Sequence, residues 1–332
     1  MGRRFDPDRA HVNSMYADES LIHEVSKLSI VILCHKRTWH LRKVLDALSL
    51  CPEAKESELI FVAQDSPSEV LDIIKDFKFA KKTLLKFNNL AFKSSAHAIN
   101  HNLFAGLKEG FLGKQSKYCI VLEDDIVVAP DAINFMLESI RVFGSDKRFR
   151  GVMSYSFNQS GMHARGDVVK INYGIGHGWI INESIYKELL RFWTGKEENH
   201  WDYFVEPYIR TGFLISPLYS KILNIGFDES ATHSAKDAEL GNLVEKSFRI
   251  GLEKAPTQIK EIKARYQHPR KDLCVISSLS KLQSIQLYLL REISFKLYKL
   301  ALKDKPRIHF IWRKLRNFTD QRFSNVSQAL ST

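Results

Sequence analysis

Two hydrophobic patterns alternate along the first part of the chain. Short runs of apolar and β-branched residues, typical of strands, cover residues 29–34, 58–65, 83–87 and 118–125. Segments with apolar residues three or four positions apart, typical of helices, cover residues 41–49, 68–77 and 95–111. Ser68 and Ser95 stand where serine commonly caps a helix. Strands alternating with helices predict an α/β domain whose parallel sheet is covered by helices on both faces.

The pattern continues less regularly to about residue 270. A helix is predicted from Pro130 to about Phe143, followed by a strand near 151–157 and a mixed region through Phe227. The small, polar stretch 228–237 resembles a loop that closes over a substrate. We therefore expect one main domain over residues 29–270, preceded by a polar N-terminal extension over 1–28.

The last segment, residues 271–332, has a different character. Apolar residues recur every three or four positions over 277–303, with Lys and Arg elsewhere on the surface, and Pro306 ends this helical pattern. Residues 308–318 begin a second amphipathic segment that carries aromatic and basic residues. Such a basic helical appendage can lie on an anionic membrane surface. The alternative is a helix packed on the main domain with a solvated basic face.

The net charge of +11 is concentrated in the same segment, where residues 281–322 hold eleven Lys and Arg against three acidic residues. The chain shows no zinc-finger spacing and no aromatic-rich basic strand, so the charge does not predict a nucleic-acid partner. No apolar stretch is long enough to span a membrane and the N-terminus lacks a signal-peptide pattern. These features predict a cytoplasmic location, and an anchor trimmed from the N-terminus is the alternative.

The four cysteines include no C-x-x-C pair, and Cys34 and Cys119 fall inside apolar runs. This placement predicts reduced, structural thiols.

Polar residues follow the predicted strands at the edge where ligands bind in parallel sheets. Glu123, Asp124 and Asp125 end one strand, where like charges repel and water is partly excluded. A bound Mn²⁺ or Mg²⁺ would offset this cost, since these cations take one or two carboxylates together with substrate phosphates. The alternative is a solvated acidic turn that caps the next helix.

Arg37 and Asp65 follow the first two strands, so they should be neighbours if those strands pair. An arginine there can contact a pyrophosphate, and an aspartate can accept a hydrogen bond from a uracil N–H. His101 lies within a polar patch of a predicted helix and could contact a ribose or phosphate. Ordinary surface charges and a structural histidine are the alternatives.

Two further segments could contribute to a site. Residues 174–179, which include His177 and Trp179, are glycine-rich and suggest a backbone that passes close to a ligand. They do not form a dinucleotide fingerprint, which needs a strand before it and a helix directly after. Asp202 follows a charged loop and could project its carboxylate into the site, with a helix N-cap as the alternative.

Taken in order, these residues resemble the GT-A-fold glycosyltransferases of the N-acetylglucosaminyltransferase I family over residues 29–237. The series comprises Arg37, Gln64-Asp65, His101, the DxD-like Glu123-Asp124-Asp125 followed by 128–131, then 176–179, Trp201-Asp202 and 226–233. Each element is weak alone, and the order and spacing of the series carry the resemblance. The resemblance implies a GT-A fold, with a mixed, mainly parallel sheet flanked by helices.

The resemblance also implies an inverting transfer from a UDP-sugar, with Mn²⁺ (or Mg²⁺) bridging its two phosphates. Asp125 would be the metal ligand, Asp124 would reach the ribose, and Glu123 would reach the transferred sugar. Residues expected on the donor side also include Arg37, Asp65 and His101 at the uridine half, His177 and Trp179, and His233 on the closing loop. Asp202 would be the general base for an acceptor on a glycan or lipid-linked saccharide, such as a cell-envelope polysaccharide.

The sequence departs from the family in three ways. His177 replaces an aliphatic residue near the donor, which leaves the sugar open, with GlcNAc as the first guess. Only one aspartate precedes the aromatic residue at Asp202, so Glu206 is a possible substitute base. Relatives in the secretory pathway carry an N-terminal anchor that this chain does not show. A catalytically silent adaptor that binds nucleotide or glycan on the same fold is the alternative function.

Overall fold

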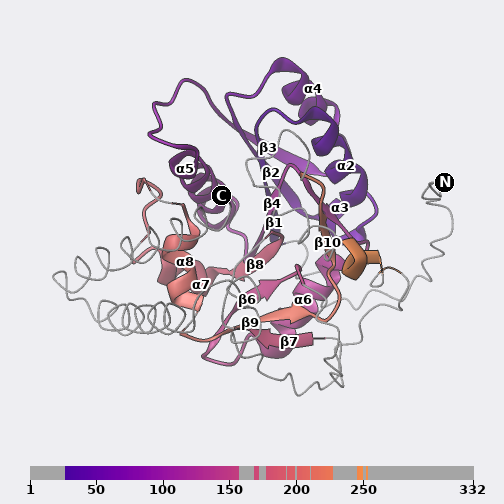
Figure 1. Ribbon diagram of the computed structural model, residues 1–332, viewed down its shortest axis with the longest axis vertical. Helices are drawn as coiled ribbons and strands as arrows, with labels where there is room; N and C mark the ends of the chain where they lie inside the picture. The colour runs from indigo at the N-terminus through magenta and orange to yellow at the C-terminus, as the bar shows by residue number, and fades with distance from the viewer. Residues whose placement is uncertain are drawn as a thin grey trace, which may run out of the picture.

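The computed structural model describes residues 27–156, 168–171, 177–191, 193–198, 200–209, 211–226, 245–249 and 252 (Figure 1). Several predicted features lie outside the described residues: the N-terminal extension up to residue 26, the loop over 228–237 with His233, and the C-terminal appendage over 271–332. The domain boundaries at 28 and 271 therefore stay predictions.

The first half of the chain alternates strands and helices as the hydrophobic pattern predicts. Its elements are β1 (Leu28–Cys34), α2 (Thr38–Leu48), α3 (Pro52–Glu56), β2 (Glu58–Gln64), α4 (Ser68–Asp76), β3 (Lys81–Phe87), α5 (Ser95–Lys108), the π-helical turn η2 (Glu109–Gly113) and β4 (Tyr118–Glu123). Strands β1, β2 and β4 are buried almost along their whole length. Such continuous burial is typical of parallel strands covered on both faces.

The second half consists of shorter elements. They are β5 (Ile126–Val128), α6 (Ala132–Phe143), β6 (Phe149–Met153), β7 (Val168–Ile171), β8 (Trp179–Asn182), α7 (Glu183–Leu189), α8 (Asp202–Ile209), β9 (Phe213–Pro217) and β10 (Ile222–Asn224). The expected strand near 151–157 corresponds to β6, which ends earlier than predicted.

The main sheet has the strand order β3-β2-β1-β4-β8-β6-β9-β7. The first four strands in this order are parallel, whereas β8 is antiparallel to both β4 and β6. The sheet is therefore mixed, with a parallel half and an irregular half, and the expected α/β class is confirmed. The expected mixed, mainly parallel sheet flanked by helices is thus confirmed, and β8, which runs back along β4, gives the sheet its mixed character.

Helices cover both faces of the parallel half, with α5 on one side and α2 and α4 on the other (Figure 1). On the α5 face, Gly106 lies so close to Val31 and Val62 that a side chain there would collide with them. On the opposite face, Ile30 and Ile32 join the main core with residues of α2 and α4. Burial on both faces fixes β1, which carries the next residues into the candidate site.

Two further expectations can be compared with the structure. Cys34, Cys51 and Cys119 are free and buried, which confirms structural thiols at Cys34 and Cys119. Across the described ranges, no helix combines the length and the apolar character needed to cross a membrane.

Candidate active site

The carboxyl ends of β1, β2 and β4 meet at one edge of the sheet. Cys34 pairs with Ala63 and Leu33 pairs with Glu123, so the residues that follow these strands become neighbours, as the sequence predicts. His35 connects the three ends. Its backbone N–H donates to Asp124 Oδ2 at 3.1 Å, and its Nδ1 lies 2.7 Å from the carbonyl oxygen of Gln64.

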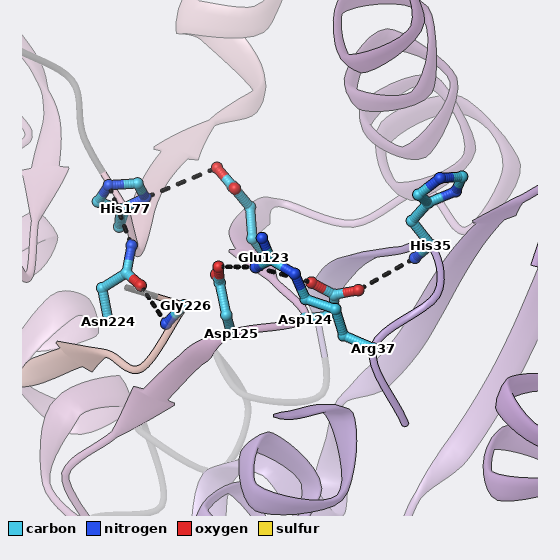
Figure 2. Close-up of polar contacts among 8 residues, drawn as sticks. All are labelled: His35, Arg37, Glu123, Asp124, Asp125, His177, Asn224 and Gly226. Carbon is cyan, nitrogen blue, oxygen red and sulfur yellow. Dashed lines mark hydrogen bonds and ion pairs between the residues drawn. The ribbon is translucent and has the colours of Figure 1, made fainter. Parts of the chain in front are cut away.

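The acidic run splits into two buried carboxylates and one outward one. Asp124 and Asp125 are only 8% and 6% exposed, whereas Glu123 is partly exposed and reaches toward His177 (Figure 2). Arg37 Nη1 donates to Asp125 Oδ2 and lies 4.0 Å from Asp124 Oδ1. Arg37 therefore acts as an internal counter-ion for the buried pair, and its side chain contacts the carboxylates rather than Asp65.

The pKa values of Asp124 and Asp125 are raised by burial and by the neighbouring carboxylates. Burial, followed by the neighbouring charge of Asp125, raises the pKa of Asp124 to about 7, although the His35 N–H and Arg37 act in the opposite direction. Burial and the charge of Glu123 likewise raise the pKa of Asp125 above its ordinary value, against the influence of Arg37 and His177. The fully ionised cluster is costly, so an additional cation would stabilise it.

One atom of this cluster fits a metal ion. Asp125 Oδ1 is buried and has no hydrogen-bond partner among the described residues. A carboxylate oxygen is the ligand type that Mg²⁺ and Mn²⁺ prefer. Within the described part of the chain, no group of three or more His, Cys, Asp or Glu is arranged to hold a metal by itself. The residue that fits a divalent cation here is therefore Asp125, through its open carboxylate oxygen.

The short β5–β10 pair closes the site from the other side. It brings Ile225 to Asp125, whose carbonyl oxygen accepts a hydrogen bond from the Ile225 N–H at 2.9 Å. The next residue, Gly226, lies against the Asp125 carboxylate and Arg37, and a Cβ there would collide with both. Asn224 Oδ1 fixes this approach by accepting from the Gly226 N–H at 2.7 Å. Glycine at position 226 thus lets the backbone approach the carboxylate cluster, and a side chain there would displace the ends of Asp125 and Arg37.

His177 lies between Glu123 and Asn224. Its Nδ1 is 3.7 Å from Glu123 Oε1, and its Nε2 is 3.4 Å from Asn224 Nδ2 (Figure 2). Burial lowers the pKa of His177, but the carboxylates of Glu123 and Asp125 outweigh this effect and the net shift is upward. The structure therefore brings His177 to the carboxylate cluster. Asn224 was missed at the sequence level, because a single asparagine in a short strand carries no pattern.

Asp65 and His101 form a second group at the end of β2 and β3. Asp65 adopts a positive φ of 44°, and its Oδ1 accepts from the Asn89 N–H at 2.9 Å. His101 packs edge-on against Phe87, with ring centroids 5.0 Å apart. This group is linked to the first through Gln64, whose Oε1 accepts from Asn102 Nδ2 at 2.6 Å.

Asp202 begins helix α8 and is anchored through its neighbour Trp201. The Trp201 ring is buried and stacks on Trp179 with centroids 5.4 Å apart. Trp179 pairs with Val121 of β4, the strand that leads into the carboxylates. Trp179 is thus enclosed by protein and supports Trp201, while the Asp202 side chain is 52% exposed with its Oδ1 2.9 Å from His200 Nδ1.

The segment before Asp202, residues 193–198, is held against α5 by hydrogen bonds to Asn100. Trp193 is buried, and its Nε1 donates to Asn100 Oδ1 at 2.7 Å, while Asn100 Nδ2 donates to the Glu197 carbonyl oxygen at 2.9 Å. Gly195 has a positive φ of 74° and lies against Phe104, which leaves no room for a side chain. An asparagine in an otherwise apolar helix face was the one sequence signal for this contact, and its role could not be deduced from it.

Three predicted features of the site cannot be placed. His233, the glycines at 174 and 176 and the side chain of Glu206 lie outside the described residues.

A family model, the GNT-I family, matches residues 9–232. Among solved structures, S. aureus TarS 1-349 is 10% identical, covers 92% of this chain and 91% of its own, and has a TM-score of 0.45. The mannosyltransferase PcManGT from Pyrobaculum calidifontis, in complex with GDP-Man and Mn²⁺, is 9% identical over 88% of this chain and 84% of its own, with a TM-score of 0.43.

A structure of S. aureus TarS is 12% identical, with a TM-score of 0.41, and the match covers 57% of this chain but only 35% of that one. The chain thus spans about a third of the length of that structure. At TM-scores this low, the likenesses say nothing about the chemistry of this chain.

Proposed function

Because the chain belongs to the GNT-I family of glycosyltransferases, we propose that it transfers a sugar from a UDP-sugar to an acceptor hydroxyl, with inversion at the anomeric carbon. The observation that supports this proposal is the buried carboxylate pair at the sheet edge, with Arg37 on one oxygen of Asp125 and no hydrogen-bond partner for the other oxygen within the described part of the chain. Such an edge is suited to a cation and a diphosphate.

On the donor side, Asp125 would hold Mn²⁺ or Mg²⁺, which when bound neutralises charge on the departing UDP. Arg37 is close enough to Asp125 to contact the same phosphates. Asp124 would accept from the ribose, and Glu123, with His177 beside it, would orient the transferred sugar. Asp65 and His101 lie farther along the edge and would hold the uridine half.

On the acceptor side, Asp202 would act as the general base. The acceptor oxygen attacks the anomeric carbon, the bond from that carbon to the UDP oxygen breaks, and the acceptor proton passes to the Asp202 carboxylate. The 52% exposure of Asp202 leaves it open to a bulky acceptor. A single displacement of this kind inverts the anomeric configuration and needs no covalent enzyme intermediate.

The acceptor we propose is a glycan or a lipid-linked saccharide of the cell envelope, reached from the cytoplasmic face of a membrane. Basic residues over 277–322 support this proposal through their attraction to anionic lipids, about 1 kcal/mol for each residue near the surface. Sedimentation with anionic liposomes should fall when the chain is cut before residue 277. Equal sedimentation of the two chains would contradict the membrane part of the proposal.

A thermal unfolding screen tests the donor class. UDP-sugars, beginning with UDP-GlcNAc, are added with Mn²⁺ or with EDTA, and a true donor should raise the unfolding temperature only with the metal. If no UDP-sugar stabilises the protein with Mn²⁺, the donor class is wrong. Release of UDP by the wild type, lost in Asp202→Asn, separates an enzyme from a silent adaptor.

A further inference from the structure

His200 and Asp202 form a polar pair that the proposed chemistry has not yet used. His200 Nδ1 lies 2.9 Å from Asp202 Oδ1, and the His200 ring packs beside the Trp201 ring with centroids 5.4 Å apart. The two side chains are 39% and 52% exposed. Both side chains are therefore accessible to a molecule that approaches from solvent.

The chemistry of the partners limits how this contact can act. An ionised carboxylate can only accept, so a proton shared across the 2.9 Å contact would come from His200 Nδ1. The contact engages Oδ1, and Oδ2 is the oxygen left to accept a proton from an acceptor hydroxyl. His200 would thus select which oxygen of Asp202 faces the acceptor.

The backbone around the pair is already fixed by other contacts. Trp201 stacks on Trp179, and Asn100 binds both Trp193 and the carbonyl oxygen of Glu197 a few residues earlier. The freedom that remains is rotation of the carboxylate, because the terminal torsion of an aspartate is broad. The close contact of His200 Nδ1 with Asp202 Oδ1 would restrict that rotation.

We propose that His200 is a positioning residue that orients the Asp202 carboxylate for proton transfer; the inference rests on the proposed function, in which Asp202 is the general base. An exposed pair of this kind contributes little to stability, roughly 0–1 kcal/mol. Its effect should instead be seen in the rate, because orientation of a reacting group changes turnover far more than it changes folding.

Three substitutions test the proposal, with UDP release from UDP-GlcNAc, or from the UDP-sugar that stabilises the protein most, as the readout in Mn²⁺. His200→Ala removes the donor, and we expect kcat to fall roughly tenfold to a hundredfold with the donor KM unchanged. His200→Asn places an amide N–H where Nδ1 was and should restore most of the rate. His200→Gln places its amide near the position of Nε2 and should stay as slow as His200→Ala.

A double variant provides the second readout. Because His200 acts only through Asp202, Asp202→Asn with His200→Ala should be no slower than Asp202→Asn alone. Calorimetry with UDP and Mn²⁺ should give the same affinity for all variants, which shows that each has folded with an intact donor site.

Three results would overturn the inference: wild-type kcat in His200→Ala, a His200→Asn variant as slow as His200→Ala, or a double variant slower than Asp202→Asn. Its failure is distinguishable from failure of the proposed function. If Asp202→Asn stops turnover and His200→Ala does not, only the role of His200 is lost. If the wild type releases no UDP, or Asp202→Asn leaves turnover unchanged, the assignment of the base fails and the inference fails with it.

Discussion

The two sides of the candidate site are built on different principles. Parallel strands in register place Asp124 and Asp125 at the sheet edge, and both carboxylates are buried with Arg37 as counter-ion. Asp202 is half exposed, and an aromatic stack and a turn bound to α5 hold its backbone. Charge is thus concentrated where the side chains are buried at the sheet edge, whereas the proposed proton acceptor is open to solvent.

Loss of the Asp202 carboxylate should have the largest effect, and it should change turnover without changing donor binding. We expect Asp202→Asn to lower turnover by roughly a hundredfold to ten-thousandfold, the usual contribution of general-base catalysis. Affinity for UDP in Mn²⁺, measured by calorimetry, should stay at the wild-type value. Glu198→Gln is the matched control, since Glu198 is an exposed carboxylate of the same loop that pairs with Lys93. If Asp202→Asn lost UDP affinity as well as turnover, the two sides of the site would not act separately.

Gly226→Ala tests the buried side without removing any charged group. A methyl group there collides with the Asp125 carboxylate, so we expect the affinity for UDP in Mn²⁺ to fall roughly tenfold to a hundredfold, as when a supporting contact of a metal site is lost. Gly106→Ala is the control, because its methyl group collides with Val31 in the core. It should lower the unfolding temperature, but Mn²⁺ should still increase the affinity for UDP. Unchanged UDP affinity in Gly226→Ala would contradict the role given to this glycine.

Replacing Asn100 and replacing Asn102, on the same helix, should affect different properties, because each asparagine supports a different side of the site. Asn100→Ala leaves the buried Trp193 N–H without its acceptor, and we expect the free energy of unfolding to fall by about 1–3 kcal/mol and turnover to fall with it. Asn102→Ala frees Gln64 next to Asp65, so donor affinity should weaken instead. Urea unfolding, kcat and UDP calorimetry measure these effects on both variants. If both variants lose stability, turnover and UDP affinity to the same extent, the two asparagines do not support different sides of the site.

Arg37→Gln should have the smallest and least intuitive effect. Since Arg37 neutralises Asp125, its removal should tighten binding of Mn²⁺ alone by about fivefold, the equivalent of about 1 kcal/mol for a partly exposed ion pair. Binding of UDP in Mn²⁺ should weaken, because the phosphates lose a contact. Weaker binding of Mn²⁺ alone by the variant would show that Arg37 supports the cation rather than competing with it.

The part of this picture that is local in sequence could be predicted. Alternating strands and helices indicate the parallel half, and the polar residues after β1, β2 and β4 indicate its functional edge, because strand ends in a parallel sheet meet regardless of side-chain detail. The contact of the Arg37 side chain with Asp125 could not be predicted, since it depends on packing between segments 88 residues apart.

The roles of single polar residues, and contacts between residues far apart in the chain, could not be predicted from the sequence. Asn224 lies 47 residues from His177, and Asn100 lies 93 residues from Trp193, and neither asparagine forms part of a periodic pattern. The pairing of β8 with β4 could not be predicted for a related reason, because its four residues are too few to show which neighbour they pair with. The resemblance to a family named Asp202, but only the structure placed His200 beside it.

Calorimetric titration of UDP in Mn²⁺ and in EDTA, on the wild type and on Asp125→Asn, tests the central claim most directly. The account predicts that Mn²⁺ tightens UDP binding to the wild type and that this increase is lost when the Asp125 carboxylate becomes an amide. Equal UDP affinity with and without Mn²⁺, or an Asp125→Asn variant that keeps the full metal-dependent increase, would contradict it.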